Sequence, residues 1–93
     1  MINEKEREDL RTRFKHHPPA TDAAANAFGL VRGECESLAA QIVALCPDGR
    51  EKALALTRIE EAMFWTNAAI ARNQPDAIER FQKLKEDAQA SQG

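Results

Sequence analysis

Hydrophobic residues recur along this chain at alternating steps of three and four, the spacing that places side chains on one face of an α-helix. One such run lies between positions 22 and 45 and consists of Phe28, Val31, Cys35, Leu38, Ile42 and Leu45. A second run has the same rhythm between positions 49 and 72 and consists of Leu56, Ile59, Met63, Thr66 and Ile70. The unbroken rhythm predicts two long helices that pack against each other along these residues.

Polar residues mark where the helices begin. Asn3 followed by Glu6 has the spacing of a capping box and predicts a short helix that runs to about Arg13. Thr21 or Asp22 can cap the first long helix in the same way. The chain therefore opens with a short helix that ends before the first long one begins.

The two long helices are separated by Pro47, Asp48 and Gly49, which all disfavour a continuous helix. Asp48 and Glu51 predict a second capping box, so the next helix is expected from about Gly49 to Arg72. Because the connection is so short, the two helices are expected to lie antiparallel.

The segment Asn73-Gln74-Pro75-Asp76 predicts a break, followed by a shorter last helix defined by Ile78, Phe81 and Leu84 that frays over residues 89–93. The sequence thus predicts an all-α protein: an antiparallel two-helix hairpin with a short N-terminal helix and a short C-terminal helix. At 93 residues the whole chain, residues 1–93, is expected to be one domain with a modest core.

Composition limits the classes of binding partner and the cellular locations that suit this chain. A formal net charge of -2 disfavours general binding to DNA or RNA polymers, which requires a broad basic surface. No apolar run approaches the roughly 20 residues of a membrane span, and the first residues lack a signal-peptide pattern. Cys35 and Cys46 are separated by about 16 Å along a helix, too far to pair, and two reduced thiols favour a cytoplasmic location.

The lead-in to the hairpin combines positive charge with rings. It consists of Arg13-Phe14-Lys15-His16-His17-Pro18-Pro19. Proline fixes its own φ and disfavours the α conformation for the preceding residue, so His16 and His17 are expected in extended backbone with both imidazoles projecting away from any helix. Such a segment suits an anionic ligand that contains ring systems.

The second long helix carries a further stripe, formed by Arg58, Ala62, Trp65, Ala69 and Arg72. A lone hairpin cannot cover two apolar faces, so this stripe predicts contact with another copy of the chain through Arg58, Trp65 and Ala69. The alternative is that the arginines at its ends reach a ligand held between subunits.

Catalytic chemistry and metal binding find little support. Adjacent His16 and His17 lack the spacing that presents two ligands to one ion, and Cys35 lies on the hairpin seam as an apolar filler. Glu60 and Glu61 have no nucleophile or second acid placed beside them by the sequence. We therefore expect no enzyme activity, no metal and no cofactor.

Several of these residues occur together in one known family. The chain resembles the phage anti-CBASS cyclic-nucleotide sponges, whose hairpin family is shared with Thoeris anti-defence proteins. The resemblance covers about residues 10–74 and rests on Arg-Phe-x-x-His-Pro-Pro at 13–19, on Cys-Pro-x-x-Arg-Glu-Lys at 46–52, and on the run from Ala55 to Asn73 around Trp65.

This resemblance implies a homohexamer that sequesters cyclic dinucleotides and cyclic trinucleotides, in separate pockets and without cleavage, inside an infected bacterial cell. His16 stands where the family commonly has a base-stacking tyrosine, and Arg72 is similar to an arginine of the trinucleotide pocket. We expect these two residues to serve different pockets. The predicted ligand-binding residues are Arg13, Lys15, His16, His17, Arg32 and Arg72. The alternative function is a helical-hairpin module that serves protein interaction and assembly without a small-molecule ligand.

Overall fold

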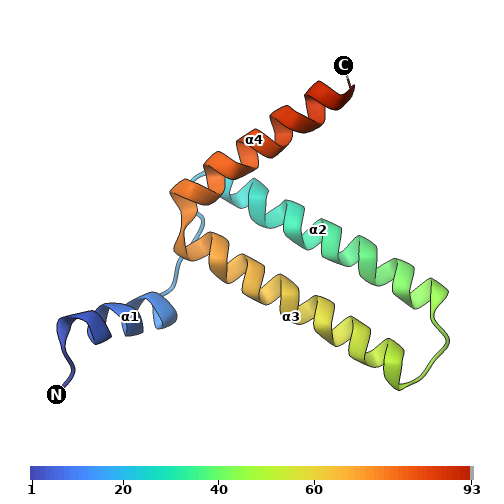
Figure 1. Ribbon diagram of the computed structural model, residues 1–93, viewed down its shortest axis with the longest axis horizontal. Coiled ribbons are helices and arrows are strands. Elements are labelled where there is room, and N and C mark those ends of the chain that lie inside the picture. Colours follow the sequence, from blue (N-terminus) through green and yellow to red (C-terminus); the bar gives the residue numbers. More distant parts are fainter. Residues whose placement is uncertain (93) are drawn as a thin grey trace.

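The computed structural model describes residues 1–92, and these form four helices with no strand among them. The helices are α1 (Glu4–Phe14), α2 (Asp22–Leu45), α3 (Arg50–Arg72) and α4 (Gln74–Gln92) (Figure 1). The all-α prediction and the four predicted helices are confirmed, with α2 and α3 as the long antiparallel pair.

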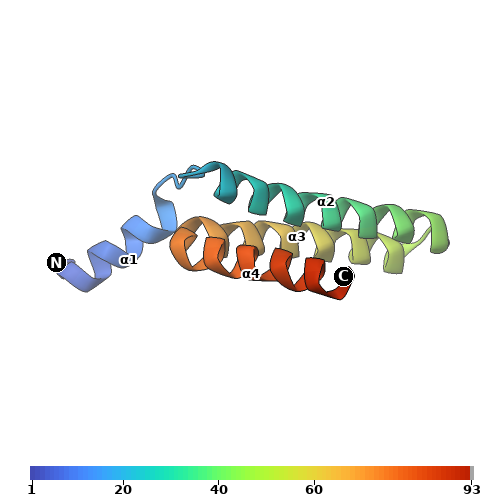
Figure 2. The same ribbon diagram turned by 90° about the horizontal axis from the view of Figure 1, so that it is seen from above.

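The hairpin of α2 and α3 forms the body of the molecule, and the other two helices leave it from one end (Figure 1). Helix α4 turns back from the end of α3 and packs mainly against α2. Helix α1 projects outward from the same end, as the side view shows (Figure 2). The corner where α1, α3 and α4 meet is therefore where residues distant in the sequence come together.

Two helix starts follow the predicted chemistry. The Asn3 side chain accepts a hydrogen bond from the Glu6 amide at 2.8 Å, and the Glu6 carboxylate accepts one from the Asn3 amide at 3.4 Å. This is the predicted capping box. Thr21 caps α2, since its hydroxyl accepts from the Ala24 amide at 3.1 Å. Both caps satisfy backbone N–H groups that the first turn of a helix leaves without partners.

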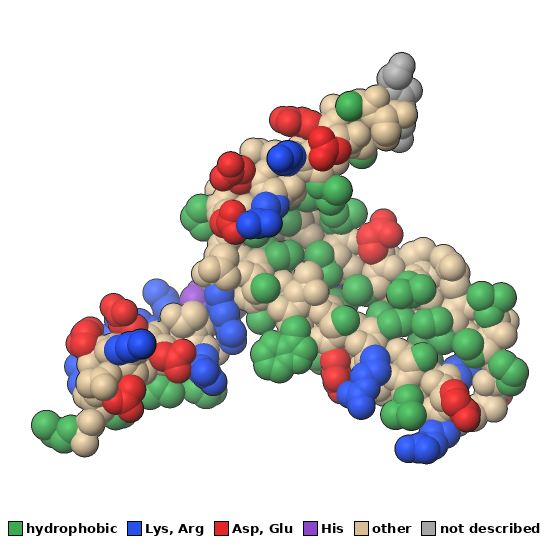
Figure 3. All heavy atoms as spheres, viewed as in Figure 1, with side chains coloured by type: hydrophobic (Ala, Val, Ile, Leu, Met, Phe, Trp, Pro, Cys, Tyr) green, Lys and Arg blue, Asp and Glu red, His purple; other side chains and the backbone are tan. Residues whose placement is uncertain are grey.

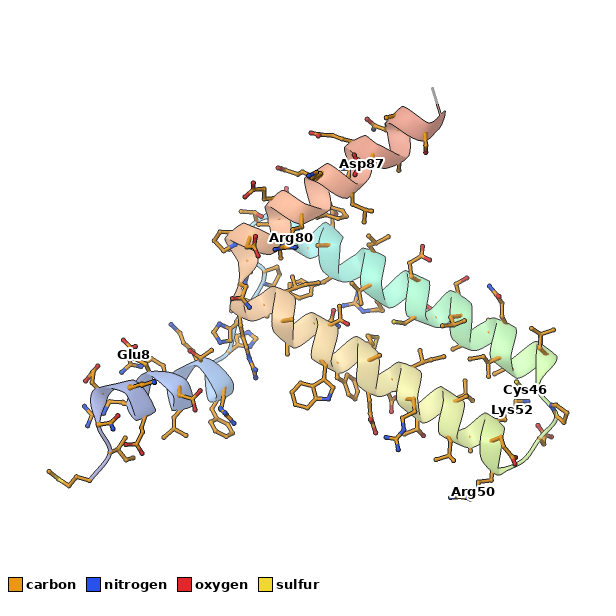
Figure 4. All side chains as sticks on the ribbon, viewed as in Figure 1. Glu8, Cys46, Arg50, Lys52, Arg80 and Asp87 are labelled. Carbon is orange, nitrogen blue, oxygen red and sulfur yellow. The ribbon has the colours of Figure 1, made fainter. Side chains whose placement is uncertain are left out.

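The capping box predicted at Asp48 and Glu51 is wrong. The N-cap of α3 is Gly49, which has no side chain to accept a hydrogen bond, so the helix begins one residue later than expected. Asp48 instead accepts from the Lys52 ammonium at 2.9 Å. Figure 4 shows Cys46 and Lys52 at this turn and Arg50 on its outer side. Because the Asp48 carboxylate is engaged by Lys52, it does not accept a hydrogen bond from a backbone amide in the first turn of α3.

The break before the last helix is also shorter than predicted. It is confined to Asn73, whose side chain donates to the Ala69 carbonyl at 2.9 Å, and α4 begins at Gln74. Pro75 lies in the first turn of α4, where a missing N–H breaks no helical hydrogen bond. The helix continues through Gln92, further than the pattern predicts, whereas Gly93 lies outside the described residues.

The hairpin seam departs from the heptad pattern. Leu38, Leu45 and Thr66 are exposed, although the rhythm placed them on the seam. Ala39 and Cys46 are half-buried in place of their neighbours on α2. A straight α-helix has 3.6 residues per turn, so its inward face drifts from a strict seven-residue repeat over a helix of this length.

The most buried residues lie where α2 begins. Ala24 is 0% exposed and Ala27 is 4% exposed, and they are the two buried hydrophobic residues of the described chain. Ala27 lines an apolar hollow with Leu30, Phe81 and Leu84, so α4 covers this end of α2. The small side chains allow α2 and α4 to approach closely.

The molecule is thin and open. It measures 52 × 43 × 17 Å, with a radius of gyration of 17.1 Å. A compact domain of this length would have a radius of gyration of about 12 Å. Hydrophobic side chains spread over the visible face of the hairpin, whereas charged side chains surround α1 (Figure 3). A single copy thus leaves much apolar surface exposed to water.

Candidate ligand-binding site

The lead-in between α1 and α2 is not helical, and it leaves α1 through an extended Lys15, but its two histidines differ. His16 is exposed, whereas His17 is half-buried and its Nε2 donates to the Thr12 carbonyl at 2.9 Å. The prediction that both imidazoles project away from the helices is therefore wrong for His17. The end of α1 leaves carbonyl groups without helical partners, and the His17 ring satisfies one of them.

Gln74 holds the lead-in against the corner where α3 meets α4. Its side-chain Oε1 accepts from the Ala20 amide at 2.7 Å, and its Nε2 donates to the Pro18 carbonyl at 2.8 Å. These bonds join residues that are 54 and 56 positions apart in the sequence. The first residue of α4 thereby fixes the proline segment in place.

Arg72 makes a second link across this corner. Its Nη2 donates to the Arg13 carbonyl at 3.3 Å, although the two residues are 59 positions apart. Arg13 itself pairs with Asp9, with its Nε 3.0 Å from the carboxylate. The fold therefore brings Arg72 to the end of α1, next to the lead-in that carries His16, although the two regions are far apart in the sequence.

These contacts border an open hollow of about 490 Å³ between α1 and α3. It is lined by Asp9, Thr12, Arg13, Phe14, Trp65 and Arg72. Phe14 is 80% exposed and Trp65 is 69% exposed, so both rings are accessible to a partner or ligand. Two arginines and two aromatic residues therefore line one hollow together with a single acidic residue, Asp9, which is the partner of Arg13.

Lys15 and Arg32 do not line this hollow. Lys15 is exposed on the lead-in, and no hydrogen bond or ion pair from its side chain is found within the described residues. Arg32 is exposed on α2 and borders a separate groove of about 280 Å³ between α2 and α3. His16 and His17 are not among the lining residues of the hollow either, so of the six residues predicted as ligand-binding only Arg13 and Arg72 line it.

The stripe on α3 is exposed along its length. Arg58, Ala62, Trp65, Ala69 and Arg72 are all exposed in the single chain. Arg58 forms an ion pair with Glu61, in which its Nη1 donates to both carboxylate oxygens, at 3.1 and 3.0 Å. The stripe is therefore accessible to a second copy of the chain, with one of its arginines already paired.

Other chemistry can be located as well. Cys35 and Cys46 are both free and half-buried. Within residues 1–92, no group of three His, Cys, Asp or Glu side chains is placed to hold a metal ion. Over the same residues, none of the helices combines the length and hydropathy that a bilayer span requires.

Sequence reasoning missed Gln74 as a residue of this corner and counted it only as part of a helix break. Its partners Pro18 and Ala20 lie more than fifty positions away, so no local pattern indicates the contact. Phe14 was noted in the lead-in, but its place opposite Trp65 across the hollow was not predicted. The exposed ring beside two cations is the signal that could have suggested it.

Comparison with known proteins gives one match. Residues 6–71 match the family described as "Acb2/Tad1, hairpin domain". No curated protein and no solved structure shows a significant match. The matched residues include most of α1, the lead-in and α2, and reach almost to the end of α3, so α4 lies beyond them.

Proposed function

We propose that this chain, which belongs to the Acb2/Tad1 hairpin-domain family of anti-CBASS and anti-Thoeris sponge proteins, sequesters cyclic dinucleotides, cyclic trinucleotides or both. In this role the protein holds the signal intact, without cleaving it, and lowers its free concentration. The setting is the cytoplasm of a bacterium infected by a phage, where CBASS signalling takes place.

The observation that supports this function best is the hollow between α1 and α3. A cyclic oligonucleotide presents phosphates and bases together, so its binder needs guanidinium or ammonium donors beside flat surfaces for stacking. Arg13 and Arg72 supply the donors, and Phe14 and Trp65 supply the rings. Stacking on one ring contributes roughly 1–3 kcal/mol per base.

Assembly belongs to the same proposal. The radius of gyration of 17.1 Å and the presence of only two buried hydrophobic residues in the described chain support association with further copies. We propose a homo-oligomer, a hexamer by resemblance to the family, with Arg58, Trp65 and Ala69 at a contact between subunits.

Calorimetric titration of the purified protein with a panel of cyclic di- and trinucleotides tests the proposal. We expect saturable binding of at least one cyclic ligand, and weaker binding of its linear counterpart. Denaturation of the complex followed by chromatography should return the starting ligand. Linear product that increases with protein concentration would show an enzyme instead, and no binding across the panel would reject the sponge function.

The exposed apolar stripe on α3 also supports a second candidate, an assembly module without a small-molecule ligand. Ultraviolet absorbance separates the two functions, because one Trp and no Tyr contribute little at 260 nm. A co-purified nucleotide would raise that signal and favour the sponge. A nucleotide-free protein that assembles normally and binds none of the panel would favour the module.

A further inference from the structure

The clearest feature that the proposed function does not use is the side-chain amide of Gln74. It makes three hydrogen bonds to three carbonyl or amide groups of the main chain. Two of them reach the lead-in at Pro18 and Ala20, and the third reaches the Ala71 carbonyl at 3.3 Å. One side chain thus joins the end of α3, the start of α4 and the proline segment.

The chemistry of the proline segment explains why an amide is suited to this place. Pro18 and Pro19 have no N–H, so the segment cannot satisfy its own main chain through a helical turn. The Pro18 carbonyl and the Ala20 amide flank Pro19 and need one donor and one acceptor. A glutamine side chain presents both groups at one end, whereas a carboxylate would supply the acceptor alone.

The position of α1 depends on very few contacts. Helix α1 has no buried residue, so packing contributes little to where it stands. Within the described residues, the hydrogen bonds between residues 1–20 and residues 50–92 come from the side chains of Gln74 and Arg72 alone. Arg13 and Phe14, on one wall of the hollow, are therefore held opposite Trp65 and Arg72 by these two side chains.

We propose that Gln74 is a positioning residue that sets the distance between the two walls of the ligand-binding hollow, an inference that rests on the proposed function. Gln74 touches the lead-in rather than the hollow, and it lies outside residues 6–71 that match the family. Its effect on a ligand is transmitted through the backbone of residues 18–20 to the end of α1.

The test uses the full chain with Gln74→Met, which keeps the length of the side chain and removes its hydrogen bonds. Gln74→Glu keeps the acceptor for the Ala20 amide, and Gln82→Met is the matched control on an exposed glutamine of α4. Three quantities are measured: hydrogen exchange at the Ala20 amide, fluorescence of Trp65, and affinity for a cyclic trinucleotide of adenosine and a cyclic dinucleotide of guanosine.

For Gln74→Met we expect Ala20 exchange to accelerate about tenfold, Trp65 emission to shift, and affinity for the bound probe to fall about tenfold, the scale of losing one or two hydrogen bonds. Gln74→Glu keeps the acceptor for the Ala20 amide but faces the Pro18 carbonyl with a second acceptor, so its Ala20 protection and its affinity should fall between those of the wild type and Gln74→Met. Gln82→Met should match the wild type in all three measurements.

Two failures are distinguishable. If the wild type binds a probe and Gln74→Met binds it equally well while Ala20 loses protection, the positioning role is overturned and the sponge function stands. If the wild type binds neither probe, the proposed function fails and the positioning inference fails with it. If Gln74→Met does not fold, Gln74→Glu serves as the test: reduced Ala20 protection together with reduced affinity supports the inference, and wild-type affinity overturns it.

Discussion

At the scale of single residues, Arg72 is the cation that both lines the hollow and reaches across it to the end of α1. One nitrogen of its guanidinium donates to the Arg13 carbonyl, which leaves further N–H groups for a phosphate in the hollow. We expect Arg72→Ala to weaken cyclic trinucleotide binding by roughly 1.5–3 kcal/mol, the range for losing a charge-assisted hydrogen bond. Calorimetry measures the loss directly.

The matched control for this prediction is Arg80→Ala. Arg80 lies on α4, pairs with Asp76 at 3.0 Å and does not line the hollow (Figure 4). It carries the same charge, so a general electrostatic effect would weaken binding equally in both variants. An Arg80→Ala loss as large as that of Arg72→Ala would remove Arg72 from the ligand contacts.

The two histidines should behave differently because only His17 is engaged by the fold. His17→Ala loses the hydrogen bond to the Thr12 carbonyl and should lower the free energy of unfolding by about 0.5–1.5 kcal/mol. His16→Ala should leave stability unchanged and weaken cyclic dinucleotide binding, by resemblance to the family. Thermal unfolding measures the stability of both variants, and calorimetry measures their affinity for a cyclic dinucleotide. Equal losses of stability in the two variants would contradict the prediction.

At the scale of helices, the tightest packing in the described chain lies at small side chains where α2 begins. Ala24 is fully buried where α2 begins, whereas its neighbour Ala25 is exposed. Overpacking a filled contact typically costs about 1–3 kcal/mol, so Ala24→Leu should lower the free energy of unfolding by that amount. Ala25→Leu is the control and should change stability little. Denaturant unfolding followed by circular dichroism measures both, and equal curves would refute tight packing at Ala24.

Much of the helical arrangement could be predicted because its causes are local. The Asn3 cap, the Thr21 cap and the turn at Pro47 to Gly49 depend on neighbours within a few residues, and all three are found. The predicted cap at Asp48 was wrong because two nearby donors, Lys52 and a backbone amide, compete for one carboxylate. The sequence alone does not show which of the two donors binds it.

The site could be predicted less well because it joins distant segments. Charge and rings in the lead-in indicated a ligand surface, and the hollow does contain Arg13 and Arg72. The contacts that build it, from Gln74 to Pro18 and from Arg72 to Arg13, span more than fifty residues. Such contacts follow from the path of the whole chain, which no spacing along one helix reveals.

At the scale of the whole molecule, the open shape of the monomer and its exposed apolar surface both favour association with further copies. Exposed large hydrophobic residues occur on α1, α2, α3 and α4, and they include Leu10, Leu38, Phe64, Trp65 and Leu84. An extended monomer of this kind gains stability when copies cover these faces, because burial contributes roughly 25 cal/mol per Å² of apolar surface. Folding and assembly should therefore be coupled, with a melting temperature that rises with protein concentration.

The contact between copies is tested most directly at Trp65. If the α3 stripe is an interface, Trp65→Glu places a charge in a desolvated contact and should cost about 2 kcal/mol or more per contact. We expect the mass measured by light scattering to fall to a smaller species. Thr57→Glu introduces the same charge at an exposed position of α3 outside the stripe and should keep the wild-type mass.

Trp65 also lines the hollow, so mass and ligand affinity must be measured on the same variant. A smaller species shows that the ring belongs to the subunit contact, whether or not binding is lost. Lost binding with an unchanged mass and unchanged thermal stability would assign the ring to the ligand and move the interface elsewhere. A charge buried in a true interface would break the contact and lower the mass of the assembly. A Trp65→Glu variant with the wild-type mass would therefore show that the stripe is not a contact between subunits.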